Sequence, residues 1–362
     1  MRILVLNCGS TTLKYGLFHA DGNGVPRPLA GAAMPLPPAG IPPLARLLDH
    51  VPHAPDAVAH RIVHGGDGLG EVALIDGTVL AGLESHAQLA PLHAAHAIEL
   101  VRAVAKLKLP QVAAFDSAFH ATLPPHARRY PLPEIAGLHR VGFHGWSHRS
   151  AMERYAVVAC NAAPTLVTLH LGGGCSAAAI RDGRSVDTSM GFTPLEGLMM
   201  GTRPGDLDPG IVLHLIRTGY TSERLEQLLH HESGLRGVAG DADMRALLAR
   251  TDEPARLAVE MFCYRVRKYV GAYLAALEGA AAAVVFTGGI GERAPEIRRR
   301  VCVGLEWAGV VLDAERNLRG DERISADGSP LRLYTIRSNE EVLIAREAAA
   351  LLRRDTQRPR AT

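Results

Sequence analysis

The chain has 362 residues, 47% of them hydrophobic, so it can bury a large core and is long enough for two domains. Its 39 basic and 37 acidic residues are spread along the sequence, which argues against nucleic acid or a membrane surface as a partner. Five widely spaced cysteines without a CxxC pair exclude a disulfide framework and a zinc ribbon. With a strand pattern in place of a signal peptide, these features predict a cytoplasmic protein that acts on small molecules.

The first half of the chain predicts strands and helices in alternation. Residues 2–7 and 13–19 have the pattern of two strands joined by the turn CGSTT, which is an opening hairpin. The proline- and alanine-rich segment 25–55 disfavours central strands, and we expect surface connections there. The elements expected next are a strand at 57–63, a glycine turn, a helical stretch around 84–106 and a strand at 111–116.

The second half repeats the opening pattern. The strand LVTLHL, a glycine turn, the strand SAAAIR and the turn Asp182-Gly183 reproduce the first hairpin, which indicates a duplication. A polar residue precedes the glycines in both hairpins, Asn7 in the first and His170 in the second.

Helix signals follow further along the second half. Asp252 can cap a helix that begins near Pro254, and Gly279 is a natural stop. The strand AAVVFT then leads through the loop GGIGE into a helix from about Pro295. We expect the polar tail 357–362 to fray.

Three glycine-rich turns suggest a shared ligand. Residues 172–177, GGGCSA, match the G-x-G-x-x-A dinucleotide fingerprint, with Glu196 beyond them. A parallel crossover needs a dozen or more residues, and too few precede Asp182, so a hairpin is favoured over a dehydrogenase. No P-loop motif occurs. Backbone amides in glycine turns bind anionic oxygen, so we expect two phosphate-binding hairpins and, at GGIGE, a loop for a base or ribose.

Seventeen histidines raise a metal hydrolase as an alternative. His60 and His64 are four residues apart in a strand, about 13 Å, which is too far for one zinc ion. His144 and His148 straddle Gly145 before a helix start, so a shared helical face is doubtful, and no HExxH motif occurs. We favour hydrogen-bonded core histidines for His148 and for His120.

Polar side chains lie beside these turns or at strand ends. Arg61 and Asp116 occupy the carboxyl ends of expected strands, where ligands collect in open α/β sheets. The segment 188–210 is broken by glycine and proline yet apolar, and we interpret it as a site-lining segment that delivers Arg203.

Nine motifs in order resemble the acetokinase family, which comprises acetate kinase and its short-chain acyl kinase relatives in the sugar kinase, Hsp70 and actin superfamily. They are NCGSTTLKYGLF, AHRIVHGG, LAPLH, FDSAFH, GFHGWSH, HLGGGCS, DTSMGFTPLEGLMMGTRPGDLDPG, VVFTGGIGER and SNEEVLIARE. The resemblance implies an α/β fold of two duplicated ribonuclease H-like, actin-like domains (ββ-β-α-β-α core) with an interdomain active-site cleft, usually in a homodimer. We expect an acyl-side domain of 1–117 with 342–356 and a nucleotide-side domain of 118–341.

The resemblance also implies reversible transfer of a phosphoryl group from ATP to acetate, with Mg²⁺ or Mn²⁺. The implied catalytic residues are Asp116, His144 and Arg203. The implied substrate contacts are Arg61, Val63, Leu92, His93, Phe143 and Pro194. The implied nucleotide contacts are Lys14, His170, Leu171, Gly172, Gly173, Gly174, Asp243, Met244, Arg245, Gly289, Ile290, Gly291, Glu292 and Arg293. The implied magnesium ligands are Asn7 and Glu340.

Several alternatives stay open beside the resemblance. One methylene is worth only about 1–3 kcal/mol in an apolar pocket, so a propionate kinase is the nearest rival. Gly173 and Arg293 stand where the family has asparagine, which leaves ATP, GTP or another phosphoryl donor open. A non-catalytic nucleotide switch of the actin or Hsp70 kind would have no need of Arg61 and Arg203 for an acyl acceptor.

Overall fold

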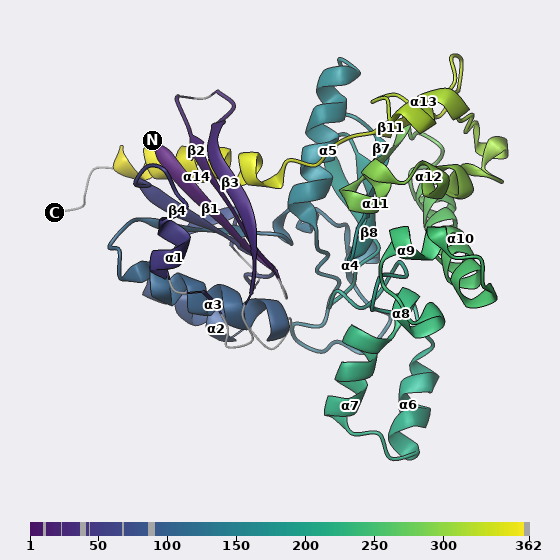
Figure 1. The fold of residues 1–362 in the computed structure, drawn as a ribbon, viewed down its shortest axis with the longest axis horizontal. Helices are drawn as coiled ribbons and strands as arrows, with labels where there is room; N and C mark the ends of the chain where they lie inside the picture. The colour runs from purple at the N-terminus through teal and green to yellow at the C-terminus, as the bar shows by residue number, and fades with distance from the viewer. Residues whose placement is uncertain are drawn as a thin grey trace. The chain divides into compact units, whose positions relative to one another are not determined.

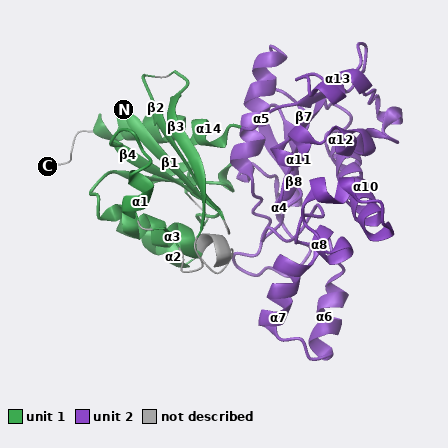
Figure 2. Cartoon of the chain, in the orientation of Figure 1, with its two compact units in different colours: residues 1–119, 339–362 green, residues 120–338 purple. Residues whose placement is uncertain are grey.

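The computed structural model describes residues 1–9, 12–22, 24–36, 41–42, 44–66, 69–85 and 91–357, with the backbone alone at 91–94. The chain divides into two compact units (Figure 2). Unit 1 contains Met1–Phe119 and Asn339–Thr362, and unit 2 contains His120–Ser338. Each unit has its own sheet and its own core (Figure 1).

Unit 1 is built on a sheet whose described strands run in the order β3-β2-β1-β4-β6-β5. The strands are β1 (Arg2–Cys8), β2 (Thr12–His19), β3 (Arg27–Pro35), β4 (Ala57–Ile62), β5 (Val72–Leu74) and β6 (Gln111–Phe115). β1, β4 and β6 are parallel, whereas β2, β3 and β5 join antiparallel. The predicted hairpin of residues 2–7 and 13–19 is confirmed.

Apolar runs in the central strands build the core of unit 1. Leu4, Leu6 and Val58 pack with Leu100 from helix α3 (Pro91–Ala105), and all four are almost fully buried. Helix α14 (Glu340–Thr356) also contacts β1 and β4, and it buries residues such as Ile344. Because both faces of these parallel strands are covered, β1 and β4 are buried along almost their whole length.

The expectation for residues 25–55 was partly wrong. This segment forms β3 and the short helix α1 (Leu44–Leu48) where we expected surface connections. β3 is an edge strand, and an edge tolerates proline because one row of its N–H groups needs no partner in the sheet. Pro28 pairs with Phe18 next to a register shift in β2, where the ladder is already irregular.

The helical stretch expected around 84–106 contains α3, and the structure has a further helix before it, α2. α2 (Gly77–Ser85) begins after Asp76, whose carboxylate accepts a hydrogen bond from the amide of Val79 at 2.8 Å. α3 begins only at Pro91, since proline at a first helical position lacks just a donor that would be unpaired anyway.

Unit 2 is built on a sheet whose described strands run in the order β11-β10-β7-β8-β9. The strands are β7 (Leu166–Leu171), β8 (Cys175–Arg181), β9 (Arg184–Thr188), β10 (Ala283–Thr287) and β11 (Arg332–Thr335). β7, β8 and β9 are antiparallel, and β7, β10 and β11 are parallel. The turn Asp182-Gly183 has φ of 51° and 75°, as a tight hairpin turn requires.

Helices surround the second sheet. The longer ones are α5 (Gly145–Val158), α6 (Pro209–Arg217), α10 (Glu253–Ala276) and α12 (Pro295–Cys302). The shorter ones are α4 (Pro125–Arg128), α7 (Ser222–Gln227), α8 (Gly234–Ala239), α9 (Met244–Ala249), α11 (Gly288–Arg293) and α13 (Ala314–Arg319). As predicted, the Asp252 side chain caps α10 by accepting from the amide of Ala255.

One sequence expectation for this unit was wrong, whereas the expected fold class of the chain is confirmed. The segment GGIGE, expected as a loop, is part of helix α11, which follows β10 directly. Glycine disfavours a helix in isolation, so the sequence signal was weak, but packing against β7 and β10 supports the helix here. The fold class is confirmed: the chain is α/β with two mixed sheets.

The five cysteines are all free thiols. Cys8, Cys175, Cys263 and Cys302 are buried free thiols, and Cys160 is an exposed free thiol. Among the described residues, none of the helices combines the length and apolar character that crossing a bilayer demands.

Candidate functional site

A guanidinium-centred cluster lies at the carboxyl ends of the parallel strands of unit 1. Arg61, near the end of β4, donates from Nε and Nη2 to the two carboxylate oxygens of Asp116 at 3.0 and 2.5 Å. Its Nη1 donates to Oδ1 of Asn7 in β1 at 3.0 Å. Glu340, at the start of α14, places Oε2 3.6 Å from the Arg61 Nε. The sheet topology brings Arg61, Asp116 and Asn7 together, and the start of α14 adds Glu340.

The charges in this cluster are largely removed from water. Exposure of the side chains is 17% for Arg61, 2% for Asp116 and 14% for Glu340. Burial raises the pKa of Glu340 to about 7, although the Arg61 charge opposes that shift. One guanidinium therefore faces two carboxyl groups, and the second is incompletely neutralised.

The other site residues expected in unit 1 have no side-chain hydrogen bond or ion pair described with the Arg61 cluster. Lys14 pairs with Asn7 across the β1–β2 hairpin, and its side chain is exposed. Val63 follows β4 and is half-buried. Leu92 and His93 belong to α3, and the structure describes only their backbone.

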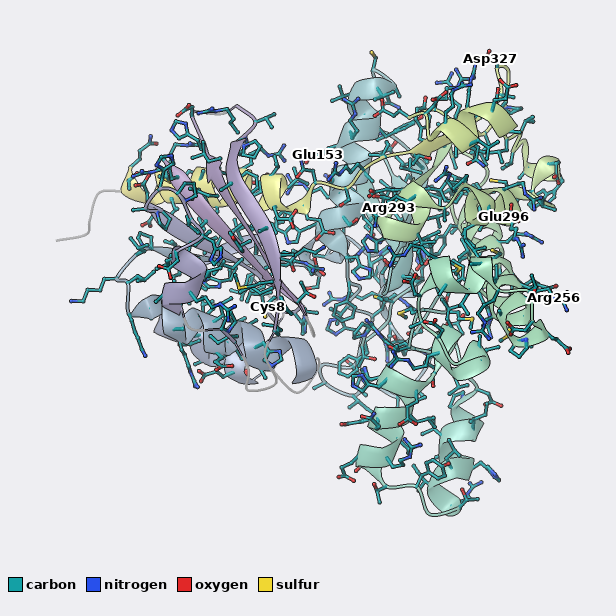
Figure 3. All side chains as sticks on the ribbon, in the orientation of Figure 1. Cys8, Glu153, Arg256, Arg293, Glu296 and Asp327 are labelled. Carbon is teal, nitrogen blue, oxygen red and sulfur yellow. The ribbon has the colours of Figure 1, made fainter. Side chains whose placement is uncertain are left out.

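Three segments of unit 2 meet at one pocket of about 460 Å³. Two of them are glycine-rich, and the third is the sequence DMR (243–245). Eight residues expected as nucleotide contacts line it: Gly172, Gly173, Asp243, Met244, Arg245, Gly289, Ile290 and Arg293. Arg293 is exposed on α11 (Figure 3). Arg245 makes a two-point ion pair with Asp243, with bonds of 3.1 and 2.6 Å, and this pairing defines one side of the pocket.

The remaining expected nucleotide contacts do not line this pocket. Leu171 and Gly291 are buried, and His170 bonds through Nδ1 to the Ser147 hydroxyl. The Glu292 carboxylate accepts from the amide of Ser338 at 3.2 Å. Gly174 lies beside His144 and Arg203 instead.

The pocket requires close backbone packing at Gly288. Its φ is 75°, and a Cβ there would lie 2.7 Å from the carbonyl oxygen of Leu171. Glycine is the residue that meets both demands, so β10 can turn into α11 directly against β7. The sequence therefore places glycine here to position the pocket wall.

Arg203 and His144 converge on the glycine turn between β7 and β8. A Cβ on Gly174 would lie 3.3 Å from the His144 Nε2 and 3.4 Å from an Arg203 Nη2. Arg203 also donates to the carbonyl oxygen of Pro194 at 2.8 Å, and burial lowers the pKa of its guanidinium. A cation and an imidazole thus share one small region beside a glycine backbone, an arrangement suited to anionic oxygen.

His144 has a backbone conformation that non-glycine residues rarely adopt. Its φ is 58° and its ψ is 25°, in the left-handed region, immediately before α5. Such conformations cost free energy and occur preferentially at functional sites. His144 precedes α5, so it shares no helical face with His148, but both rings bond the same Ser176 hydroxyl, at 2.9 and 2.8 Å.

The segment before Arg203 is held by a polar network. Arg140 donates to the carbonyl oxygens of Thr188 and Met190 and binds the Glu196 carboxylate at 2.6 Å. Tyr130 donates to the same carboxylate. Glu196, which the dinucleotide fingerprint would have used for a ribose, therefore holds the segment in place.

Sequence reasoning missed several residues of the pocket and its support. Ala242, Leu248 and Ala294 line the pocket, and Leu248 is one helical turn after Met244, a spacing that could have indicated it. Arg298 was also missed; it is 1% exposed and donates to the carbonyl oxygens of Gly291 and Glu292. Arginine inside a helix gives no signal of burial in sequence.

Comparison with known proteins adds independent evidence. A family model described as the acetokinase family matches residues 48–346. The chain is 43% identical to the acetate kinase of Solibacter usitatus, an alignment covering 96% of this chain and 97% of that protein. It is 41% identical to the acetate kinase of Heliobacterium modesticaldum, covering 98% of this chain and all of that one.

Solved structures agree with the sequence relatives. The Porphyromonas gingivalis acetate kinase has a TM-score of 0.86 at 34% identity, with 97% of this chain and 99% of that chain covered. A propionate kinase from Francisella tularensis has a TM-score of 0.87 at 34% identity, with 96% and 98% covered. These likenesses make the chain an enzyme of the phosphotransferase class. More particularly, it belongs to the acetokinase family.

Proposed function

We propose that the chain is an acetate kinase, which transfers the γ-phosphoryl group of ATP to acetate by direct in-line displacement and gives acetyl phosphate and ADP. The observation that carries the proposal is the likeness to acetate kinases over almost the whole chain, with the charged residues expected for the reaction present. The reaction is reversible, because the same groups stabilise one transition state from either side.

Arg61 is the proposed acetate-binding residue. A carboxylate is already a nucleophile at neutral pH, so the reaction needs positioning and charge stabilisation more than a general base. Asp116 binds Arg61 at two points and fixes the plane of the guanidinium. We therefore assign Asp116 to orienting Arg61 and its surroundings.

The residues beside Arg61 fit a magnesium ion. Magnesium prefers hard oxygen ligands and is held by one or two protein groups plus waters and phosphates. Asn7 and Glu340 offer an amide oxygen and a carboxylate, and a cation there would add positive charge beside the two carboxyl groups that Arg61 faces. When bound, the ion would neutralise charge on the phosphates.

The glycine-lined pocket of unit 2 is the proposed nucleotide site. Its backbone at Gly172 and Gly173 is open to phosphate, and Ile290 with Met244 provides apolar surface for a base. Arg293 adds a cation to the rim of the pocket. ATP is the co-substrate proposed, and GTP is an outcome of the test below.

His144 and Arg203 are proposed to stabilise the transferring phosphoryl group. Both lie at Gly174, and Arg203 carries a permanent charge in a buried setting, where electrostatic stabilisation is strong. No role for either as a nucleophile is needed.

Propionate is the second candidate acceptor. The similarity to a propionate kinase structure is as high as that to an acetate kinase structure. Phe143 and Pro194 are buried in unit 2 and Val63 is half-buried in unit 1, and these apolar residues are proposed to select the acyl chain. Discrimination by one methylene is about 1–3 kcal/mol, so both acids are expected to react at different rates.

A coupled assay tests the proposal. Acetate, propionate and butyrate are each combined with ATP or GTP and Mg²⁺, and ADP or GDP release and hydroxamate from acyl phosphate are measured. We expect acetate with ATP to give the highest kcat/KM. Absence of acyl phosphate in every combination, with nucleotide still bound, would favour a nucleotide switch and refute the kinase.

A homodimer is also proposed. Ile211, Leu213 and Ile216 on α6 are 43 to 52% exposed, and apolar side chains that are this exposed in series suit a subunit interface. Light scattering after size exclusion measures the mass directly, and a mass of one chain at micromolar concentration would contradict the proposal.

A further inference from the structure

A chain of buried hydrogen bonds runs from β7 to His144 within unit 2. The Thr168 hydroxyl lies 2.8 Å from Nδ1 of His148, and Nε2 of the same ring lies 2.8 Å from the Ser176 hydroxyl. Ser176 lies 2.9 Å from Nδ1 of His144. Thr168, His148 and Ser176 are each 0% exposed, so the two bonds of His148 are shielded from water.

The direction of the chain follows from Thr168. Within the described part of the chain, its hydroxyl makes one side-chain hydrogen bond, to Nδ1 of His148. A hydroxyl has one proton and two lone pairs, and a buried donor left unpaired costs more than an unused lone pair. Thr168 therefore donates, and Nδ1 of His148 accepts.

The remaining bonds then have a single consistent polarity. Burial lowers the pKa of His148 well below its ordinary value, so the ring is neutral and its proton is on Nε2. That N–H donates to the Ser176 oxygen, which leaves the Ser176 proton for Nδ1 of His144. A neutral His144 with an accepting Nδ1 carries its own proton on Nε2.

The protonated nitrogen is the one that faces the glycine turn. Nε2 of His144 is the atom that would lie 3.3 Å from a Cβ on Gly174, beside the Arg203 guanidinium. The neighbouring His170 ring, whose centroid is 4.3 Å from that of His144, bonds through Nδ1 to Ser147. A neutral donor at this position adds a hydrogen bond without a second cation next to Arg203.

We propose that Thr168, His148 and Ser176 are positioning residues that fix His144 in the neutral Nε2–H tautomer and direct that N–H toward the Gly174 backbone. The inference rests on the proposed function only in giving this N–H a phosphoryl group to bind. The tautomer itself is a property of the free protein. His148, which the sequence suggested as an ordinary core histidine, thereby acts on the site through Ser176.

The tautomer can be observed without any ligand. In the full ¹⁵N-labelled chain at neutral pH, long-range ¹H–¹⁵N correlation spectra distinguish Nδ1–H, Nε2–H and doubly protonated rings, and His144→Gln assigns the signal. We expect a neutral Nε2–H ring at His144. A proton on Nδ1, whether in the neutral or the doubly protonated ring, would overturn the proposal, and this measurement does not depend on any buried variant folding.

Ser176→Ala tests whether this chain of hydrogen bonds, called the relay below, fixes the tautomer of His144. Loss of the Ser176 proton should let both neutral tautomers of His144 exchange, and kcat should fall about tenfold or more while KM for acetate changes less. Ser185→Ala is the matched control, because Ser185 is also 0% exposed and bonds a histidine, His120, at 2.8 Å. It should leave the His144 spectrum unchanged.

The outcomes separate the two proposals. An unchanged His144 tautomer in Ser176→Ala, or a change of equal size in Ser185→Ala, would refute the relay whatever the activity. An Nε2–H ring at His144 in a chain that makes no acyl phosphate would support the relay and refute the proposed function.

Discussion

Arg298 binds both oxygens of Asn317. Its Nε donates to Oδ1 and its Nη2 to the backbone carbonyl, each at 2.7 Å, and its Nη1 reaches the carbonyl oxygens of Gly291 and Glu292 at 2.9 Å. The side chain is 1% exposed, and burial lowers the pKa of its guanidinium. Amide and carbonyl dipoles stabilise this charge, and they join α13 to the end of α11.

The first prediction concerns this buried arginine. Arg298→Lys keeps the charge but has too few donors in the right plane for four acceptors, so the free energy of unfolding should fall by about 2–4 kcal/mol. KM for the nucleotide should rise more than KM for acetate, because α11 forms one wall of the pocket. Denaturant unfolding and steady-state kinetics measure the two effects.

A matched control for Arg298 lies one residue further on α12. Arg299 is 53% exposed and pairs with Glu296 at 2.8 Å (Figure 3 labels Glu296). Arg299→Lys should change stability by less than about 1 kcal/mol. If both variants lost the same free energy of unfolding, the buried bonds of Arg298 to Gly291 and Asn317 would stabilise the protein no more than an exposed ion pair does.

The second prediction concerns Arg61. Arg61→Lys cannot keep two bonds to Asp116 and one to Asn7 at once, so kcat/KM for acetate should fall about 100-fold or more while KM for ATP changes little. Arg102→Lys in α3, which alters an exposed ion pair with Glu84, is the comparison in the same unit. If Arg61→Lys had the same kinetics as the unaltered protein, Arg61 would have no role in binding acetate.

The third prediction concerns Arg203. Arg203→Ala removes a buried cation next to Gly174, and the rate of phosphoryl transfer should drop about 10³-fold. Circular dichroism shows whether the fold is kept, and Arg256→Ala, an exposed position on α10 (Figure 3), is the control. Unchanged turnover in Arg203→Ala would exclude it from the mechanism.

The fourth prediction is a loss of stability in acid. Burial lowers the pKa of His60 from 6.5 to about 4, and its Nε2 lies 2.8 Å from Gln111. The unfolded chain then binds more protons than the folded one between these pH values, so stability is full above pH 6.5 and falls as the pH drops toward 4. The contribution of His60 is about 3 kcal/mol in all.

A variant without the imidazole isolates this effect. In His60→Asn, the slope of unfolding free energy against pH between about 6.5 and 5 should decrease by up to about 1.4 kcal/mol per pH unit. His148 has a pKa shifted in the same direction and should keep part of the slope. A slope that stays the same would show that His60 is not neutral in the folded protein.

Local patterns in the sequence predicted most of the strands. Alternating or continuous apolar runs bounded by glycine gave both hairpins, and Asp252 gave the start of α10, because these signals depend on neighbouring residues. β3 was missed since its prolines are unfavourable except at an edge, and edge position is decided by the partner strands. The helix α11 was missed because contacts with β7 override the low helix propensity of glycine.

Part of the candidate site could likewise be predicted from the sequence, and part could not. The sequence predicted that Arg61 and Asp116 lie at the carboxyl ends of strands, and the pairing of β4 with β6 makes them neighbours. The Ser176 bridge between His144 and His148 was beyond sequence reasoning, because it depends on the left-handed backbone at His144 and on a hydroxyl from another strand. Arg298 was missed for a similar reason, as its acceptors are backbone oxygens distant in sequence.

The distribution of thiols has a practical consequence. Burial raises the pKa of Cys8 to about 11 and that of Cys175, Cys263 and Cys302 to about 12, so these groups remain protonated and shielded near neutral pH. Cys160, just after α5, is exposed. A maleimide dye should therefore attach at one place on the unaltered protein, which gives an optical reporter on the outer end of α5 without any engineering.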